Sequence, residues 1–103
     1  MPLIPEFYPE VEAFDWDAGN TEKSQAKHAV SWVEAEQLFF NRPIVVAEAY
    51  SSQDERRHFA LGRTNAGRHL TVVFTIRGSR LRVISARPMS RRERRAYAKA
   101  QAH

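Results

Sequence analysis

Arginine is concentrated in one short part of this sequence. Residues 80–97, which read RLRVISARPMSRRERRAY, contain seven arginines. A guanidinium group stays protonated at any working pH and binds the oxygens of a phosphate or a carboxylate in pairs. The first half of the stretch alternates apolar and polar residues like a strand, whereas the second half is typical of a helix. This density of charge predicts a surface that binds nucleic acid or an acidic protein partner, unless it serves only solvation.

Arginines also occur throughout the predicted strands. Arg82 stands in the middle of a strand on the same face as Ile84, so we expect its side chain to be half-buried. A half-buried guanidinium needs a carboxylate or a phosphate beside it. An internal salt bridge and a ligand contact therefore both explain Arg82. The carboxylates available for a salt bridge are those of Asp15, Asp17, Glu34 and Glu93.

A lysine and a histidine stand together at Lys27 and His28, where a helix is expected to end. A cation in the last turn of a helix is explained simply by compensation of the helix dipole. The pair also suits proton transfer beside a phosphate, because histidine titrates near neutral pH. Dipole compensation and catalysis both stay open for Lys27 and His28 at this level.

The remaining chemistry-bearing residues form no known metal or cofactor motif. The four histidines share no ligand spacing, cysteine is absent and the four glycines are scattered, so we expect no metal, no cofactor and no phosphate-binding loop. The formal net charge is +4, which favours acidic or phosphate-bearing partners. No apolar run reaches the length of a membrane span and no secretory signal is visible, so we expect a cytoplasmic protein without a membrane partner.

Local patterns predict the elements that must position these residues. Two Ser-x-x-Glu capping boxes, at Ser31 and Ser90, predict where two helices start. One apolar stripe of the first of these helices is predicted to face the core, and it consists of Trp32, Ala35, Leu38 and Phe39. The expected elements in chain order are a strand at 13–17, helices at 20–28 and 31–40, strands at 43–50, 57–63, 69–77 and 80–87, and a helix from Ser90 to about Lys99.

We therefore predict an α+β fold. An N-terminal strand and two helices precede a four-stranded antiparallel meander, and a further helix ends the chain. The strands of the meander are joined by short connections that contain glycine, as hairpins require. Residues 1–12 contain three prolines and are expected to form an extended arm, which leaves 13–103 as a single domain.

Several stretches, in this order, resemble the BrnT family of ribonuclease toxins, which belong to type II toxin–antitoxin systems. The stretches are FDWD at 14–17, KHAVSWVEA at 27–35, ERRHFALGR at 55–63, LTVVFTIRGSRLRVISAR at 70–87 and SRRERRAY at 90–97. The resemblance implies a RelE-like fold and an endoribonuclease that cleaves mRNA without a metal. It also implies neutralisation by a cognate BrnA-like antitoxin. That antitoxin has a DNA-binding domain, so the toxin reaches promoter DNA only indirectly.

The resemblance also implies roles for individual residues. Its catalytic set falls on Lys27, His28, Arg57, Arg82 and Arg87. In the last helix, the residues with a structural or partner-facing role are Glu93 and Tyr97. Among the other arginines, those expected to contact RNA are Arg63, Arg77, Arg80, Arg91 and Arg94.

Four positions depart from the family pattern. Ser24 stands where the family usually has asparagine, Ala29 where it has glycine, and Pro88 and Met89 where it has a basic residue and alanine. Glycine allows the left-handed backbone that often ends a helix, whereas the Cβ of Ala29 resists it. Two further hypotheses stay open, namely a non-catalytic module that binds nucleic acid and a decayed toxin that serves as an antitoxin-binding scaffold.

Overall fold

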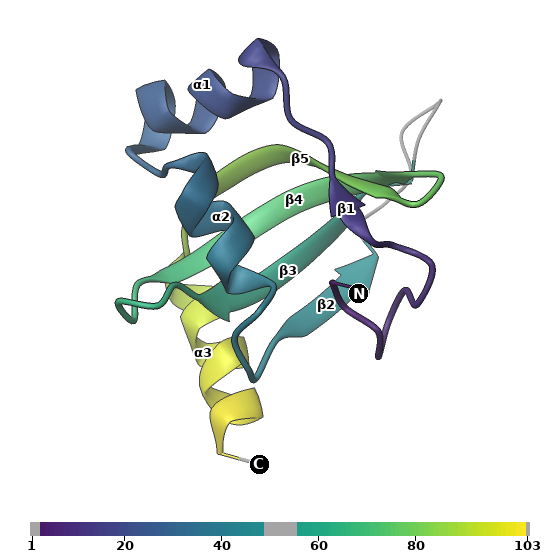
Figure 1. Ribbon diagram of the computed structural model, residues 1–103. Coiled ribbons are helices and arrows are strands. Elements are labelled where there is room, and N and C mark those ends of the chain that lie inside the picture. The colour runs from purple at the N-terminus through teal and green to yellow at the C-terminus, as the bar shows by residue number, and fades with distance from the viewer. Residues whose placement is uncertain (1–2, 49–55, 103) are drawn as a thin grey trace.

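The structure is a computed structural model that describes residues 3–48 and 56–102. Helices α1 and α2 lie over one side of a sheet, and α3 lies at the end where the last strand finishes (Figure 1). The elements in chain order are β1 (Ala13–Phe14), α1 (Ala18–His28), α2 (Trp32–Leu38), β2 (Val45–Glu48), β3 (His58–Arg63), β4 (His69–Arg77), β5 (Arg80–Pro88) and α3 (Arg91–Gln101). The mixed α+β architecture is confirmed, while the last two residues of the strand expected at 43–50 lie outside the described residues.

The sheet has five strands in the order β1-β5-β4-β3-β2. Strands β2 to β5 pair antiparallel, as predicted. The sheet differs from the prediction in one respect. The N-terminal strand β1 was expected to stand apart from the four-stranded meander, but it joins the same sheet parallel to β5. The amide of Asp15 donates to the carbonyl of Leu81 over 2.8 Å. A parallel pair needs a long crossover, which here is most of the chain, so a local pattern could not indicate it.

Two apolar clusters hold the layers together. The larger one lies between the sheet and helices α1 and α2, and it includes Phe39 from the end of α2 and Phe74 from β4, whose ring centroids are 5.5 Å apart. The smaller one joins α3 to the opposite face of the sheet and consists of Leu61, Met89 and Tyr97. Helix α3 covers only the end of that face near Leu61. The buried side chains on the rest of that face therefore belong to neither cluster.

The start of α2 confirms one prediction and corrects another. Ser31 accepts a hydrogen bond from the amide of Glu34, and the Glu34 carboxylate accepts from Ser31, which is the expected capping box. Ala35, Leu38 and Phe39 are buried. Trp32 was expected in the same stripe but is 46% exposed. As the first residue of a seven-residue helix, it lies at the margin of the layer and faces outward.

The N-terminal segment is folded back rather than extended, which corrects the expected arm. The amide of Leu3 donates to the carbonyl of Val11 over 3.0 Å, and Ile4 pairs with Tyr8 in an isolated bridge. Ile4 and Val11 are completely buried in the larger cluster. The prolines of this segment suit tight turns as well as extended backbone, and burial of the apolar residues favours the turns.

Tyr8 holds this segment against a buried histidine. The Tyr8 hydroxyl and His58 Nδ1 are 2.7 Å apart, and the His58 ring stacks on Phe74. Burial lowers the pKa of His58 below its ordinary value of 6.5, because the charged imidazole loses its water; nearby Glu48 opposes this shift. His58 is therefore neutral in the folded protein at pH 7.

Stability is expected to fall as the pH is lowered from 7 to about 5, because unfolded His58 takes up a proton near its ordinary pKa and folded His58 does not. The contribution of neutral His58 is present above the unfolded pKa and is lost below it. Replacing His58 by glutamine removes this titration, so the free energy of unfolding depends less on pH in H58Q. Urea denaturation across this pH range measures the slope. The wild-type protein is the reference, and an equal slope in H58Q contradicts the prediction.

Candidate functional site

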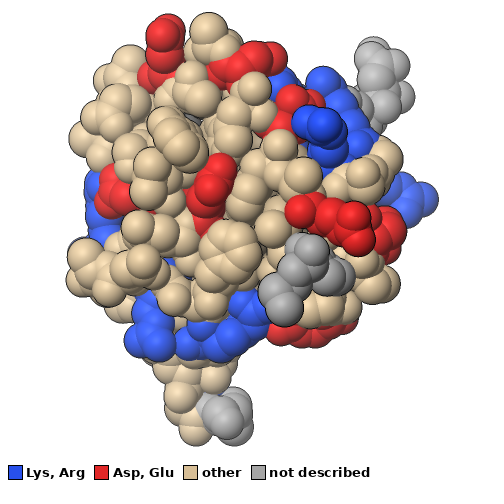
Figure 2. Space-filling view, in the orientation of Figure 1, with Lys and Arg blue, Asp and Glu red and all other residues tan. Residues whose placement is uncertain are grey.

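Four arginines gather where the β4–β5 hairpin turns. Arg80 and Arg82 lie on β5, Arg77 lies on β4, and Arg57 immediately precedes β3, whose first residue His58 pairs with Phe74. Alternate residues of a strand share a face, so these four side chains lie on the sheet face that points away from α1 and α2. We call the set Arg57, Arg77, Arg80 and Arg82 the basic sheet end. Figure 2 shows basic side chains on the side of the molecule where this hairpin lies in Figure 1.

A bulge in β5 decides which arginines share this face. The pairing between β4 and β5 shifts at Val73/Phe74, so that Ile84 is an extra residue. Arg82 then pairs with Thr75, and Arg87 pairs with Thr71. Thr71 and Thr75 are four residues apart on β4, so their side chains point to the same face of the sheet. Without the extra residue, strict alternation would point Arg82 and Arg87 to opposite faces. The bulge therefore turns both guanidinium groups away from α1 and α2.

Arg82 sits between two carboxylates. Its Nη1 lies 3.6 Å from Asp15 Oδ1 and its Nη2 lies 3.0 Å from Asp17 Oδ2. The side chain is only 20% exposed, which agrees with the expected half-burial. Hydrogen bonding from Arg82, the largest effect, and from the Asn20 amide lowers the pKa of Asp17. Of the two explanations for Arg82, the structure has the internal salt bridge, and the parallel pairing of β1 supplies Asp15.

The hairpin end carries an unfavourable pair. Arg77 and Arg80 are direct partners across the strands, separated only by the turn residues Gly78 and Ser79. Like charges directly opposite each other destabilise a sheet. Both side chains are exposed. Gly78, with a φ of 61°, provides the left-handed backbone that this tight turn requires.

Arg87 holds the start of α3. Its two terminal nitrogens bind both oxygens of Glu93 at 2.7 and 2.9 Å. Glu93 also accepts from the Ser90 amide, so that the predicted capping box is present. The paired hydrogen bonds from Arg87, more than any other interaction, lower the pKa of Glu93 to about 2. Arg87 thus connects β5 to α3 through an ion pair.

Tyr97 fixes α3 from the other side. It is 1% exposed, and its hydroxyl donates to the carbonyl of Pro43 over 2.7 Å. Tyr97 is therefore structural and is buried away from any partner. Arg91 and Arg94, by contrast, are exposed on α3 and have no ion-pair partner among the residues that the structure describes. Arg63 is also exposed and donates to the carbonyl of Arg42 at the far edge of the sheet.

Lys27 and His28 lie at the other end of α1 from Arg82. The helix begins just after Asp17, which binds Arg82, and ends at His28 eleven residues later. At 1.5 Å per residue this separation is about 16 Å. The structure therefore does not bring Lys27 and His28 together with the basic sheet end. The five residues expected to be catalytic therefore lie in three places. Arg57 and Arg82 are in the basic sheet end, Lys27 and His28 are at the end of α1, and Arg87 is in the ion pair with Glu93.

Arg68 is a residue that sequence reasoning missed. Its guanidinium donates to the carbonyl of Ala29 over 2.9 Å and forms an ion pair with Glu34 at 3.2 Å. It thereby fastens the turn between α1 and α2 to the β3–β4 connection. No local signal marks Arg68, because its partners lie more than thirty residues away in the chain.

Ala29 ends α1 in the left-handed conformation, with a φ of 53°. Its amide donates to the carbonyl of Gln25, which is the αL type of helix end. The family usually has glycine here, and alanine adopts this backbone only at a cost. The side chain of Ser24, a second departure, lies outside the described residues, and Pro88, the third, ends β5.

Replacing Ala29 by glycine is expected to raise the free energy of unfolding by about 0.5–1 kcal/mol, because the relief of strain exceeds the added entropy of the unfolded chain. Thermal and urea denaturation measure this change. The matched control is Ala26→Gly, which lies within the same helix and is exposed; it should lower stability by about 1 kcal/mol. If Ala29→Gly and Ala26→Gly change the free energy of unfolding equally, the backbone at Ala29 is not strained.

Two features are absent from the residues that the structure describes. Within residues 3–48 and 56–102, no group of three or more His, Asp or Glu side chains is arranged to hold a metal ion. In the same ranges no helix is both long and apolar enough to cross a membrane.

Comparison with known proteins identifies the family. A family model described as "Ribonuclease toxin, BrnT, of type II toxin-antitoxin system" matches residues 16–93. The chain belongs to the BrnT family. Among solved structures, it is similar to the Brucella abortus ribonuclease toxin BrnT, with 25% sequence identity and a TM-score of 0.56; the match covers 79% of this chain and all of the other. None of the curated proteins matches.

The family membership confirms the resemblance drawn from the sequence. The match at 16–93 begins at Trp16 and ends at Glu93, so it includes all of α1 and α2, the meander and the Arg87–Glu93 pair. A BrnT-family protein is a ribonuclease toxin of a type II system, and such a system implies an antitoxin as partner.

Proposed function

We propose that this chain is an endoribonuclease toxin that cleaves mRNA without a metal and is neutralised by a cognate BrnA-like antitoxin. The observation that carries the proposal is the basic sheet end, where Arg77 and Arg80 face each other and Arg57 lies on the same face. Arg57 and Arg80 are exposed at this end, and guanidinium groups bind the oxygens of a phosphodiester in pairs. We further propose a RelE-like fold, action in the cytoplasm, and contact with promoter DNA only through the antitoxin.

In this proposal the 2′-hydroxyl of the RNA attacks the adjacent phosphorus, and the 5′-oxygen of the next nucleotide leaves and takes a proton from solvent water. DNA lacks that hydroxyl and is not cleaved. Arg57, Arg77 and Arg80 bind the phosphate oxygens and stabilise the charge that develops on them. Arginine is a poor base because it stays protonated. Asp15, beside Arg82 on the same face, accepts the proton from the 2′-hydroxyl.

Arg82 has a positioning role in this proposal. Two carboxylates already surround it, so it holds Asp15 in place while its remaining charge attracts the phosphate. An ordinary carboxylate is a weak base at neutral pH. We therefore expect slow cleavage of free RNA, with the rate depending mainly on how the arginines bind and orient the phosphate.

The other predicted residues contribute to binding along the RNA or to the partner. Lys27 and His28 lie about one helix length from the basic sheet end, so in this proposal they contact a neighbouring nucleotide and not the reacting phosphate. Arg91 and Arg94 on α3 bind the RNA backbone or an acidic segment of the antitoxin. Arg63 extends the RNA path at the far edge of the sheet, and Arg87 keeps α3 in place through Glu93.

A second candidate function is a scaffold that binds the antitoxin without cleaving RNA. The observation in its favour is that Arg82 and Arg87 are both engaged in ion pairs, while His28 lies away from them. In that case the arginines bind nucleic acid or the partner, and no chemistry follows.

Incubating the purified protein with single-stranded RNA in EDTA separates the two functions. The toxin produces fragments that end in a 2′,3′-cyclic phosphate, because the 2′-hydroxyl is the nucleophile. The same sequence as DNA should stay intact. RNA that is bound but not cleaved, as seen by a mobility shift, contradicts the toxin and supports the scaffold.

A further inference from the structure

The opposite side of the molecule from α3 carries exposed aromatic side chains. Trp32 is 46% exposed, Val33 is 44% exposed and Phe40 is 59% exposed, all from α2 or the turn after it. Trp16 and Phe14, next to them, are partly buried. We call these five residues the aromatic face. Exposed apolar residues that occur singly need no explanation, but a contiguous group marks an interaction surface.

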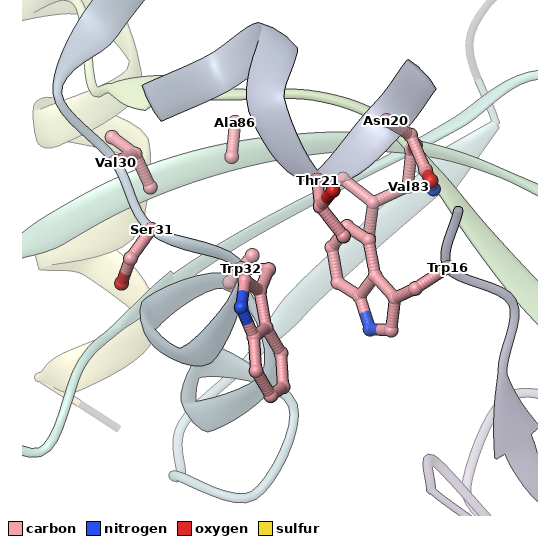
Figure 3. A pocket seen from close by; sticks show the side chains of 9 residues that line it. Trp16, Asn20, Thr21, Val30, Ser31, Trp32, Val83 and Ala86 are labelled. Carbon is pink, nitrogen blue, oxygen red and sulfur yellow. The ribbon is translucent and has the colours of Figure 1, made fainter. Parts of the chain in front are cut away.

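The rings of the aromatic face contact one another in a chain. The centroids of Trp32 and Trp16 are 6.2 Å apart, those of Trp16 and Phe14 are 6.4 Å apart, and those of Phe14 and Phe40 are 6.2 Å apart. Figure 3 shows the two indoles side by side at the crevice between α1 and α2. Rings held in this way lose little conformational entropy when a partner binds, which favours affinity.

The crevice between the two indoles is not a ligand pocket that would explain the exposed aromatic side chains. Its walls include Asn20, Val30 and Val83 behind the two tryptophans, and it has no room for even a water molecule. A small ligand therefore has no cavity to enter here. What the face offers is an outer surface that a macromolecule can cover.

The charge of this face is opposite to that of the whole chain. The two segments that build it, 10–22 and 31–41, contain no lysine or arginine, although the chain carries a net charge of +4. Arg82 binds Asp15 and Asp17, and Arg68 binds Glu34, so the charge of the face itself comes from Glu36. Glu36 lies among the rings, where its Oε2 accepts from Trp16 Nε1 over 2.7 Å. Figure 2 looks onto this side and shows an acidic group within a largely uncharged area. Such a surface repels RNA and attracts a cationic partner.

We propose that the aromatic face binds a basic amphipathic helix of a protein partner. From Trp32 to Phe40 the exposed residues span about 12 Å, which matches roughly two turns of a docked helix. The apolar side of that helix covers Val33 and Phe40. Its lysines or arginines lie over the Trp32 ring and beside Glu36, so that cation–π and ionic interactions act together. Naming this partner the antitoxin rests on the proposed function, whereas the docking chemistry does not.

The test uses a fluorescently labelled helical peptide of about 18 residues, with leucine and isoleucine on one side and lysine and arginine on the other. A matched peptide carries glutamate in place of the basic residues. We expect the wild-type protein to bind the basic peptide about tenfold or more tightly than the acidic one. Trp32→Ala and Phe40→Ser should each weaken binding of the basic peptide about tenfold or more. Lys99→Ala, an exposed position on α3, is the control and should bind like wild type.

Several outcomes overturn the proposal. Equal affinity for the two peptides removes the role of charge, and unchanged binding by both Trp32→Ala and Phe40→Ser removes the role of the rings. If sedimentation shows self-association that Trp32→Ala abolishes, the occupant is a second copy of this chain. If Trp32→Ala weakens RNA binding as much as Arg57→Ala does, the occupant is nucleic acid.

The same preparations separate this proposal from the proposed ribonuclease activity. Trp32→Ala should cleave RNA at the wild-type rate while losing the peptide, which supports a docking face distinct from the reacting site. A wild-type protein that binds the peptide and cleaves no RNA refutes the ribonuclease and supports the docking face. A protein that cleaves RNA and binds neither peptide refutes the docking face alone.

Discussion

Arg57→Ala should cleave RNA about a hundredfold more slowly than wild type, in line with the loss of one fixed charge that stabilises a transition state. Arg57 is exposed, and among the described residues it has no ion-pair partner, so its removal leaves the fold intact. Its charge is therefore available to a phosphate. Single-turnover cleavage of a labelled RNA, with the protein in excess, measures the effect, and thermal denaturation confirms that the variant is folded.

The matched control for this prediction is Arg91→Ala, which removes an equally exposed arginine from α3. If cleavage depends only on overall positive charge, both variants lose similar activity, and the effect disappears at high salt. If the basic sheet end binds the reacting phosphate, Arg91→Ala stays within about twofold of wild type. Equal losses in the two variants would contradict the assignment of Arg57.

Asp15→Asn tests the proton transfer at the same site. This variant removes a negative charge near the phosphate, so RNA should bind at least as tightly as before, while cleavage should fall by a factor of about 100 or more. A simple structural role would instead weaken binding and cleavage together. Since Asp15 also binds Arg82, Arg82→Lys serves as a comparison that keeps a cation between the two aspartates. Unchanged cleavage by Asp15→Asn would show that Asp15 is not the base.

Local signals predicted most elements of this fold. The capping boxes at Ser31 and Ser90 fixed the starts of two helices because their hydrogen bonds involve only neighbours in the chain. The alternation in 69–77 matched β4 residue for residue. The salt bridge of Arg82 was also among the alternatives, because a half-buried guanidinium must find a carboxylate.

Features that depend on distant contacts were not predictable. Strict alternation cannot reveal that Ile84 is an extra residue, so the common direction of Arg82 and Arg87 was not evident from the sequence. Similarly, the adjacency of Lys27 and His28 says nothing about which end of α1 lies near the arginines. Trp32 fits an apolar stripe, yet its place in the first turn leaves it exposed. In each case the deciding contact joins residues far apart in the chain.

Gly62 is a further residue whose role depends on a distant contact, because nothing in the local sequence requires glycine there. It lies within β3, paired with Leu70, and its backbone is not left-handed. A Cβ at this position would come within 2.7 Å of Leu38 Cγ. Leu38 is completely buried in α2, so its side chain has no room to move away from a Cβ at position 62. Gly62 therefore sets how closely α2 approaches the sheet.

Gly62→Ala should lower the free energy of unfolding by about 2 kcal/mol, through overpacking against α2. Leu38→Ala alone should cost about 3 kcal/mol, because it leaves a cavity in the core. In the double variant the new methyl group at position 62 occupies part of that cavity. The combined loss should therefore be smaller than the sum by about 1–2 kcal/mol. Urea denaturation of the four proteins measures this coupling, and strict additivity would show that Gly62 and Leu38 do not limit the approach of α2.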